Sequence, residues 1–261
     1  MIESTINEFG QPVGRSLDDW LPRPTPESRA FDGGRCRLEP LASEHVGPLF
    51  ASLGGAEAED IWTYLQFGPF FDSEEFARHV HRLISDPGLV NFAIIDVASR
   101  RLEGMAAYDE ISPAAGTIEI GQVVFGRRLQ RTTGATEALY LMLSHALDDL
   151  GYRRCQWRCD ALNGRSLAAA ERLGFRYEGT WRNALISKGR SRDTAWFSIT
   201  DSDWISIGPR IRSWLDPGNF DERGKQNVAL SALTRADRTA SRPCERSVQT
   251  PHDGGGQTAS R

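Results

Sequence analysis

The sequence contains few cysteines, and they are scattered. Only four occur among 261 residues and none forms a CxxC pair, so neither a disulfide framework nor a cysteine metal site is indicated. Basic residues (31) do not outnumber acidic ones (35), and a net charge of −4 gives no general attraction to nucleic acid or to an anionic membrane. We therefore expect reduced thiols and no nucleic-acid partner.

Long apolar runs are also lacking. No stretch approaches the roughly 18 apolar residues that a membrane-spanning helix needs, and the first ten residues lack the basic and apolar regions of a secretory signal. These absences predict a cytoplasmic protein without a membrane partner.

Several common catalytic motifs are missing as well. The chain has no GxxxxGK[ST] loop, no GxSxG elbow and no HExxH pair. His79 and His81 are two positions apart, so they do not share one face of a helix. We expect no bound metal.

The composition, 39% hydrophobic and 25% charged, is that of a soluble globular protein with one main domain. Residues 1–30 hold four prolines and predict an extended N-terminal arm that lies across the body. Residues 217–261 contain one aromatic residue, Phe220, and are rich in Arg, Ser, Thr, Gly and Gln, which predicts a disordered tail. The main domain is thus expected at 31–216.

Strand candidates follow one another at 91–97, 102–110 and 117–125 without a helix between them, which indicates an antiparallel meander. A strand at 153–159 and a hairpin at 175–200 follow. In the strand, Cys155, Trp157 and Cys159 share one face, which favours buried packing over a redox pair. Helices are predicted near 43–53, 73–84, 134–150, 163–173 and 203–215.

The segment LQRTTGATEALYL (129–141) places a glycine turn between a β-like run and the first turn of an amphipathic helix. The free N–H groups of a helix's first turn and the positive end of its dipole favour a phosphate or pyrophosphate. The candidate anion-binding residues are Arg131, Thr132, Thr133, Gly134, Ala135 and Thr136.

Two motifs together carry a family resemblance. RTTGAT (131–136) resembles the [RQ]-x-x-G-x-[GA] acetyl-CoA loop of the GNAT acetyltransferases, and NGRSLAAAERLGFRYEG (163–179) resembles their second motif, N-x-x-S followed by a helix, LGF and a strand. The chain resembles the RimJ/RimL-like branch over about 35–205. Thr136 departs from the expected Gly or Ala, which predicts that a phosphate approaches the last amide of the loop less closely.

The resemblance implies a fold and a co-substrate. The fold is α+β (α/β/α layered), with one domain built on a mixed, mostly antiparallel, splayed sheet of about seven strands flanked by helices. Acetyl-CoA is the expected donor. In this family a backbone N–H of the splayed strand often binds the oxyanion, which here falls around Val123 to Phe125.

Asn163 and Ser166 each allow two interpretations. Asn163 is a favoured helix N-cap, and the resemblance implies instead that its amide binds the pantetheine arm. The Ser166 hydroxyl either protonates the departing thiolate of coenzyme A or reinforces the cap.

Acetyl transfer to an amine needs a neutral nucleophile, an oxyanion donor and a proton for the leaving thiolate. Glu119 alternates with Ile118 and Ile120 and so points to the opposite face of a central strand. Because an unpaired buried carboxylate is costly, we expect a base or water-positioning role. The alternative is a structural ion pair, perhaps with an arginine of the hairpin.

The main hypothesis is therefore a direct, acetyl-CoA-dependent N-acetyltransferase acting on a protein N-terminal α-amine or a small-molecule amine, as a monomer or homodimer. The alternative is a non-catalytic acyl-CoA-binding or protein-interaction module of the same fold. The aromatic segment 61–71 is either a packed lid or a wall of the substrate cleft. Acceptor specificity is expected there and in the 180–193 hairpin.

Overall fold

The computed structural model describes residues 4–234 and contains an eight-stranded sheet in the order β3-β4-β5-β6-β7-β8-β10-β9. Every neighbouring pair is antiparallel except β7 and β8, which are parallel. The predicted meander is confirmed as β5-β6-β7, and the predicted mixed sheet is found. The strands are β3 (Phe31–Asp32), β4 (Cys36–Pro40), β5 (Val90–Asp96), β6 (Arg101–Ser112), β7 (Thr117–Phe125), β8 (Arg154–Asp160), β9 (Arg176–Ser187) and β10 (Arg190–Thr200).

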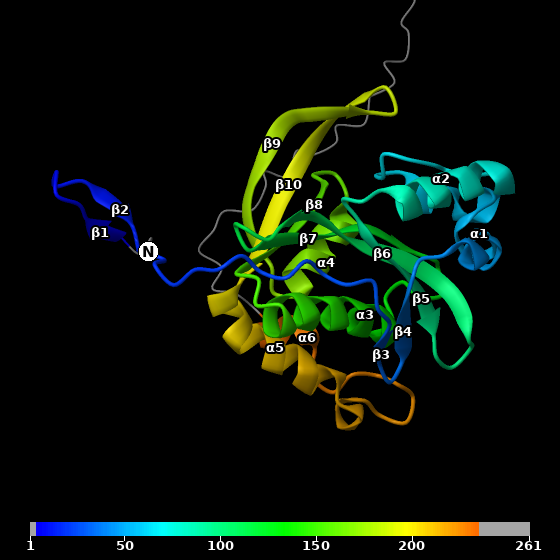
Figure 1. Cartoon of the computed structure of the whole chain (residues 1–261). Coiled ribbons are helices and arrows are strands. Elements are labelled where there is room, and N and C mark those ends of the chain that lie inside the picture. Colours follow the sequence, from blue (N-terminus) through cyan, green and yellow to red (C-terminus); the bar gives the residue numbers. More distant parts are fainter. Residues whose placement is uncertain (1–3, 235–261) are drawn as a thin grey trace, which may run out of the picture.

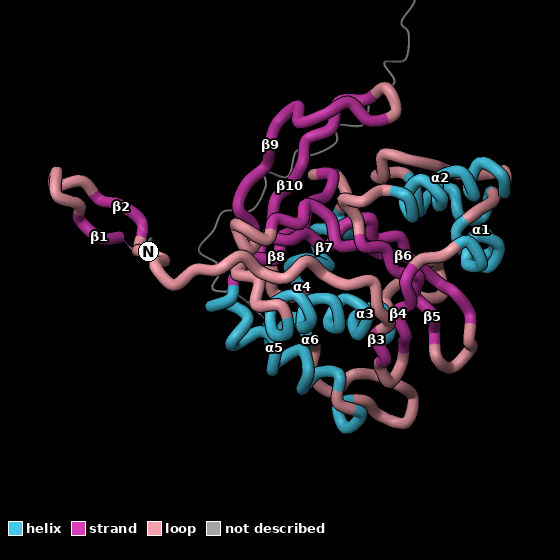
Figure 2. Tube along the Cα trace, in the orientation of Figure 1, coloured by secondary structure: helices cyan, strands magenta, loops and turns pink. Residues whose placement is uncertain are grey.

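Helices cover both faces of this sheet (Figures 1 and 2). One core joins α1 and α2 to Ala93, Met105 and Val124, and a larger one joins α3, α4 and α5 to the other face. The layers therefore follow the predicted α/β/α order. The helices are α1 (Val46–Leu53), α2 (Ser73–Ser85), α3 (Thr133–Ser144), α4 (Gly164–Arg172), α5 (Asp201–Leu215) and α6 (Leu230–Thr234), with short turns η1 (Ser43–His45), η2 (Ala56–Trp62), η3 (His145–Asp149) and η4 (Pro217–Asn219).

Apolar and polar side chains alternate along β8, and the apolar ones face α3, α4 and α5. Cys155, Trp157 and Cys159 are buried in the larger core, whereas Gln156 and Arg158 project from the other face. The cysteines are free thiols, as expected from their packing. This half of the sheet therefore has an apolar face beneath α3, α4 and α5 and a polar face opposite.

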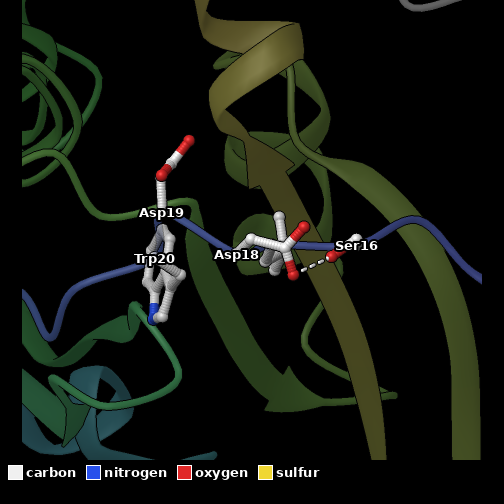
Figure 3. Close-up of a pocket in the computed structure, with 5 residues that line it drawn as sticks. Ser16, Asp18, Asp19 and Trp20 are labelled. Atoms are coloured by element: carbon white, nitrogen blue, oxygen red, sulfur yellow. Dashed lines mark hydrogen bonds between the residues drawn. The ribbon is translucent and has the colours of Figure 1, made fainter.

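The N-terminal arm contains a hairpin that the sequence did not predict, β1 (Ser4–Ile6) and β2 (Pro12–Gly14), which projects from the body in Figure 1. The arm then crosses the body in extended form. Trp20 Nε1 donates to the carbonyl of Ala114 at 2.8 Å, which fixes the arm beside the β6–β7 turn. A shallow hollow lined by residues 16–20 lies on this arm (Figure 3), at the paired rather than the open end of β7 and β8.

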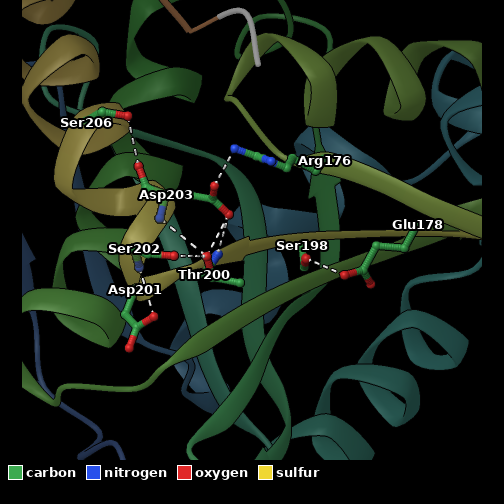
Figure 4. A network of polar contacts seen from close by, with 8 residues as sticks. All are labelled: Arg176, Glu178, Ser198, Thr200, Asp201, Ser202, Asp203 and Ser206. Atoms are coloured by element: carbon green, nitrogen blue, oxygen red, sulfur yellow. Dashed lines mark hydrogen bonds and ion pairs between the residues drawn. The ribbon is translucent and has the colours of Figure 1, made fainter. Parts of the chain in front are cut away.

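A capping box starts α5 directly after β10 (Figure 4). The Thr200 hydroxyl accepts from the N–H of Asp203, and the Asp203 carboxylate accepts from the N–H of Thr200. Arg176 of β9 pairs with Asp203 at 2.7 Å. The hairpin and α5 are thereby held in one orientation.

The predicted disordered tail is wrong for residues 217–234, while residues 235–261 lie outside the described part. Leu230 is buried in the larger core, the Phe220 ring lies 5.2 Å from the Trp214 ring, and Thr234 Oγ1 donates to the carbonyl of Arg172 at 2.7 Å. The prediction rests on the low apolar content of the segment. A few apolar side chains are nevertheless enough to order it, because they pack against the apolar surface of α5. Within the described residues, no helix is both long and apolar enough to cross a membrane.

Candidate active site

The parallel pair β7–β8 opens after only three residues. Thr117 to Glu119 pair with Arg154 to Gln156, yet β7 continues to Phe125 and β8 to Asp160. Beyond Glu119 the edge of β7 that faces β8 therefore has no ladder partner among residues 4–234. Backbone N–H and C=O groups rarely stay unpaired when buried, so this opening fits a polar, extended ligand such as a pantetheine arm.

A β-bulge lies on the open part of β7. Met105 pairs with Val124 and Ala107 with Gly121, so Gln122 and Val123 together face one residue of β6. Gln122 has a φ of +52°, a left-handed conformation that costs energy in a non-glycine residue. Bulges redirect a strand at sites of this kind. The predicted oxyanion donors, Val123 to Phe125, lie on this redirected segment.

The glycine turn forms the N-terminus of α3. Thr132 is the N-cap, and its Oγ1 accepts from the N–H of Ala135 at 3.1 Å. The helix itself does not satisfy the N–H groups of Thr133 and Gly134. Arg131, exposed and at φ +63°, comes directly before the cap. These groups, called the cradle below, lie together at one helix N-terminus. Anion binding by them stays a prediction.

Gly134 has room for a side chain within the protein. An added Cβ would meet no atom closer than 3.7 Å, which is ordinary van der Waals contact. Folding therefore does not demand a glycine here, whereas close approach of a phosphate to the backbone does. The residues present fit the pyrophosphate of acetyl-CoA.

Thr136, the residue that departs from the family pattern, is held by α4. Its side chain is fully buried, and its Oγ1 accepts from Arg172 Nη2 of α4 at 2.7 Å. The hydroxyl thus ties α3 to α4. The expected effect of Thr136 on phosphate approach stays a prediction.

The second motif is anchored by capping. Asn163 Oδ1 accepts from the N–H of Ser166 at 3.1 Å, and Ser166 Oγ accepts from Trp157 Nε1 at 3.0 Å. The N-cap interpretation of Asn163 is therefore confirmed, although capping uses only the oxygen of its amide. Burial raises the pKa of the neighbouring Cys159 to about 11, and a hydrogen bond from Ser166 lowers it.

Glu119 is the last paired residue before the opening. It is 4% exposed, and its Oε2 lies 2.5 Å from Arg158 Nε. Burial raises the pKa of Glu119 to about 8; Arg158 lowers it, and Asp109, directly opposite on β6, raises it. The ion-pair partner is thus on β8, and not on the hairpin as the sequence suggested.

Arg158 and Gly121 are two residues of this site that the sequence did not reveal. Arg158 also contacts Glu110 at 3.0 Å, and its guanidinium lies 5.0 Å from the centre of the Trp196 ring. A Cβ at Gly121 would lie 3.4 Å from Glu119 Oε1 and 3.2 Å from Asp109 Cβ, so a larger residue would crowd both carboxyl groups. Neither residue could be assigned to the site without knowing how β6, β7 and β8 pair.

The family model for the acetyltransferase (GNAT) domain matches residues 35–176. The chain belongs to the GNAT acetyltransferase family. A GCN5-related N-acetyltransferase from Brucella melitensis is 42% identical, with a TM-score of 0.82 over 84% of this chain and 99% of that one. A probable GNAT acetyltransferase from Chromobacterium violaceum is 37% identical, with a TM-score of 0.70 over 75% and 98% of the two chains.

More distant relatives agree with this assignment. The uncharacterized N-acetyltransferase p20 of Bacillus licheniformis is 26% identical over 149 residues, which are 56% of this chain and 83% of p20. RimL, a ribosomal L7/L12 alpha-N-protein acetyltransferase, is 20% identical with a TM-score of 0.57 and shares the fold. The protein is thus an N-acetyltransferase of the GNAT type, a family that implies acetyl-CoA as donor.

The two segments predicted to select the acceptor meet in this GNAT fold. Lys188 Nζ, at the tip of the β9–β10 hairpin, donates to the carbonyl of Trp62 in η2 at 2.6 Å. In the aromatic segment Trp62 and Phe70 are buried in the core beneath α1 and α2, whereas Phe67 and Phe71 are 42% and 57% exposed. The segment is therefore packed on one side and open on the other.

Glu137 is a further residue that no sequence pattern indicated. Its buried carboxylate accepts from the backbone N–H groups of Gly34, Arg35 and Cys36 at 3.2, 2.6 and 2.9 Å. The second turn of α3 is thereby fixed to the β3–β4 turn, which holds the cradle in place. Over the described residues, no group of three His, Cys, Asp or Glu side chains is arranged to hold a metal ion.

Proposed function

We propose that this protein transfers an acetyl group from acetyl-CoA directly to a neutral amine, with Glu119 as the general base. The observation that carries the proposal is a buried carboxyl group with a pKa of about 8 at the vertex of the β7–β8 opening. A base is most effective when its pKa lies near the working pH. An α-amino group has a similar reference pKa of about 8, so one weak base suffices for it.

The remaining site residues bind and orient. Acetyl-CoA supplies the activated acetyl thioester. The N–H groups of Thr133 and Gly134 and the Arg131 guanidinium hold its pyrophosphate. The Thr132 side chain caps the N–H of Ala135, and the Thr136 side chain ties α3 to α4. Asn163 offers its amide to the pantetheine arm, and the N–H groups of Val123 to Phe125 donate to the developing oxyanion.

Ser166 is the proposed proton donor to the leaving thiolate. Because its Oγ accepts from Trp157 Nε1, the hydrogen of its own hydroxyl remains available to donate. A purely structural role of Ser166 is the alternative, and the two roles differ in their effect on turnover.

The proposed acceptor is a protein N-terminal α-amine or a small-molecule amine. The α-amine is supported by the fold neighbour RimL, which is named an alpha-N-protein acetyltransferase. The test is thiol release from acetyl-CoA over a panel of amines and N-terminal peptides, with Gly134→Asp as the control. Acetyl-CoA binding without thiol release on any acceptor would instead support a binding module.

A further inference from the structure

Three polar atoms on β10 are buried without a hydrogen-bond partner anywhere in residues 4–234: Arg192 Nε, Thr194 Oγ1 and Trp196 Nε1. Thr194 is 6% exposed. Arg192 Nε lies 4.0 Å from Asp160 Oδ2, which is an ion-pair contact but too long for a hydrogen bond. A buried donor without a partner is costly, and three on one strand call for a common explanation.

These three residues occupy alternate positions, so their side chains share one face of β10. The neighbouring positions, Ala195 and Phe197, belong to the apolar core. We call the set Arg192, Thr194 and Trp196 the donor row.

The donor row lies on the same face as the proposed base. Trp196 is paired with Arg158 across β8–β10 and its ring lies beneath the Arg158 guanidinium, which in turn contacts Glu119. From Trp196 to Arg192 the row extends four residues away from that contact, roughly 14 Å at the rise of a β-strand. This length corresponds to about four residues of an extended peptide.

Trp181 of β9 lies beside the row and contacts Trp196. It is paired with Thr194 across β9–β10, and its ring lies 4.5 Å from that of Trp196. It is 61% exposed, so it can turn aside with little loss of packing. A ligand that replaced Trp181 would reach the buried atoms.

We propose that the donor row binds carbonyl or carboxylate oxygens of the acyl acceptor. The proposal rests on the proposed function and deepens it by naming the acceptor's chemistry. Arg192 Nε and Trp196 Nε1 can only donate, and Thr194 can donate as well, so the ligand must supply hydrogen-bond acceptors. An amine followed by carbonyl groups satisfies this requirement, whereas a diamine, which carries only N–H donors at neutral pH, does not.

The test compares three acceptors: a tetrapeptide with a free N-terminus, the single amino-acid amide of the same first residue, and 1,4-diaminobutane. Thr194→Val removes one donor at nearly constant shape. Trp196→Phe removes the indole N–H and keeps an aromatic ring beside Arg158, and Arg192→Met removes the charged donor. Arg210→Met, exposed on α5 at the opposite face of the sheet, is the matched control.

We expect KM for the tetrapeptide to rise roughly 3- to 10-fold in Thr194→Val and Trp196→Phe and more than tenfold in Arg192→Met, with kcat and acetyl-CoA affinity unchanged. KM for the diamine should exceed KM for the tetrapeptide in the wild type and should not change in the variants. If the variants raise KM for the amino-acid amide as much as KM for the tetrapeptide, the bound oxygens belong to a single amino-acid unit. That result would still support the donor row.

Calorimetric titration of the tetrapeptide in the presence of coenzyme A gives a second readout that needs no turnover. If the variants bind peptide as the wild type does, or if the diamine is the best acceptor, the donor row is refuted while acetyl transfer can stand. Peptide binding that is lost in Thr194→Val, together with no turnover on any amine, would support the row and overturn the proposed function.

Discussion

Replacement of Glu119 by Gln is the most direct test of the proposed chemistry. With a pKa of about 8, the Glu119 carboxyl is only about one-tenth ionised at pH 7 and about nine-tenths ionised at pH 9. If the carboxylate is the base, kcat should rise roughly tenfold between these pH values. Glu119→Gln should lower kcat by at least about 10²-fold and abolish this rise, because Gln cannot accept the proton.

The neighbours of Glu119 predict the direction in which this pH profile moves. Asp109 raises the pKa of Glu119, so Asp109→Asn should shift the rising limb to lower pH. Arg158 lowers the same pKa, so Arg158→Met should shift the limb to higher pH and reduce the rate at pH 7. The two shifts have opposite signs, which a general loss of stability would not produce.

The assay is thiol release at saturating acetyl-CoA, with an acceptor amine that stays neutral over the whole pH range. Glu110→Gln is the matched control for turnover, because Glu110 also contacts Arg158 at 3.0 Å but its side chain is 54% exposed. Since Glu110 raises the pKa of Glu119, this variant should move the rising limb to lower pH and keep the maximal rate. Coenzyme affinity should be unchanged in Glu119→Gln. A variant that keeps both the wild-type rate and the wild-type pH profile would remove Glu119 from the mechanism.

Three further outcomes test the cradle, the proton donor and the C-terminal segment. Gly134→Asp should weaken acetyl-CoA binding by at least about tenfold in an equilibrium titration, since it places a carboxylate where the pyrophosphate binds; unchanged affinity would refute the cradle. Ser166→Ala should lower both kcat and thermal stability, because Trp157 Nε1 also loses its acceptor, by about 1–3 kcal/mol; a loss of stability alone would make Ser166 structural. Leu230→Ala should cost about 2–5 kcal/mol in denaturant unfolding, because Leu230 is 1% exposed, and no change would mean that α6 does not belong to the fold.

The features that could be predicted from the sequence are those that depend on neighbouring residues. The glycine turn at Gly134, the cap at Asn163 and the buried face of Cys155 and Cys159 all follow from local spacing. The meander was predictable because its turns are short. For these elements the local pattern and the tertiary fold agree.

The features that escaped prediction depend on residues far apart in the chain. Arg158 meets Glu119 only because β7 and β8 are parallel neighbours joined by α3. Glu137 receives three N–H groups from a turn about a hundred residues earlier. The bulge at Gln122 changes the register by one residue, and alternation alone gives no sign of it. Non-local pairing therefore decides the electrostatics of the site.

Arg158 connects the two halves of the site. Its guanidinium is shared between Glu119, Glu110 and the ring of Trp196, so only part of its field acts on Glu119. This division, together with burial and Asp109, explains how a carboxyl group 2.5 Å from an arginine keeps a pKa of about 8. Arg158 thus contacts both Trp196 of the donor row and the proposed base.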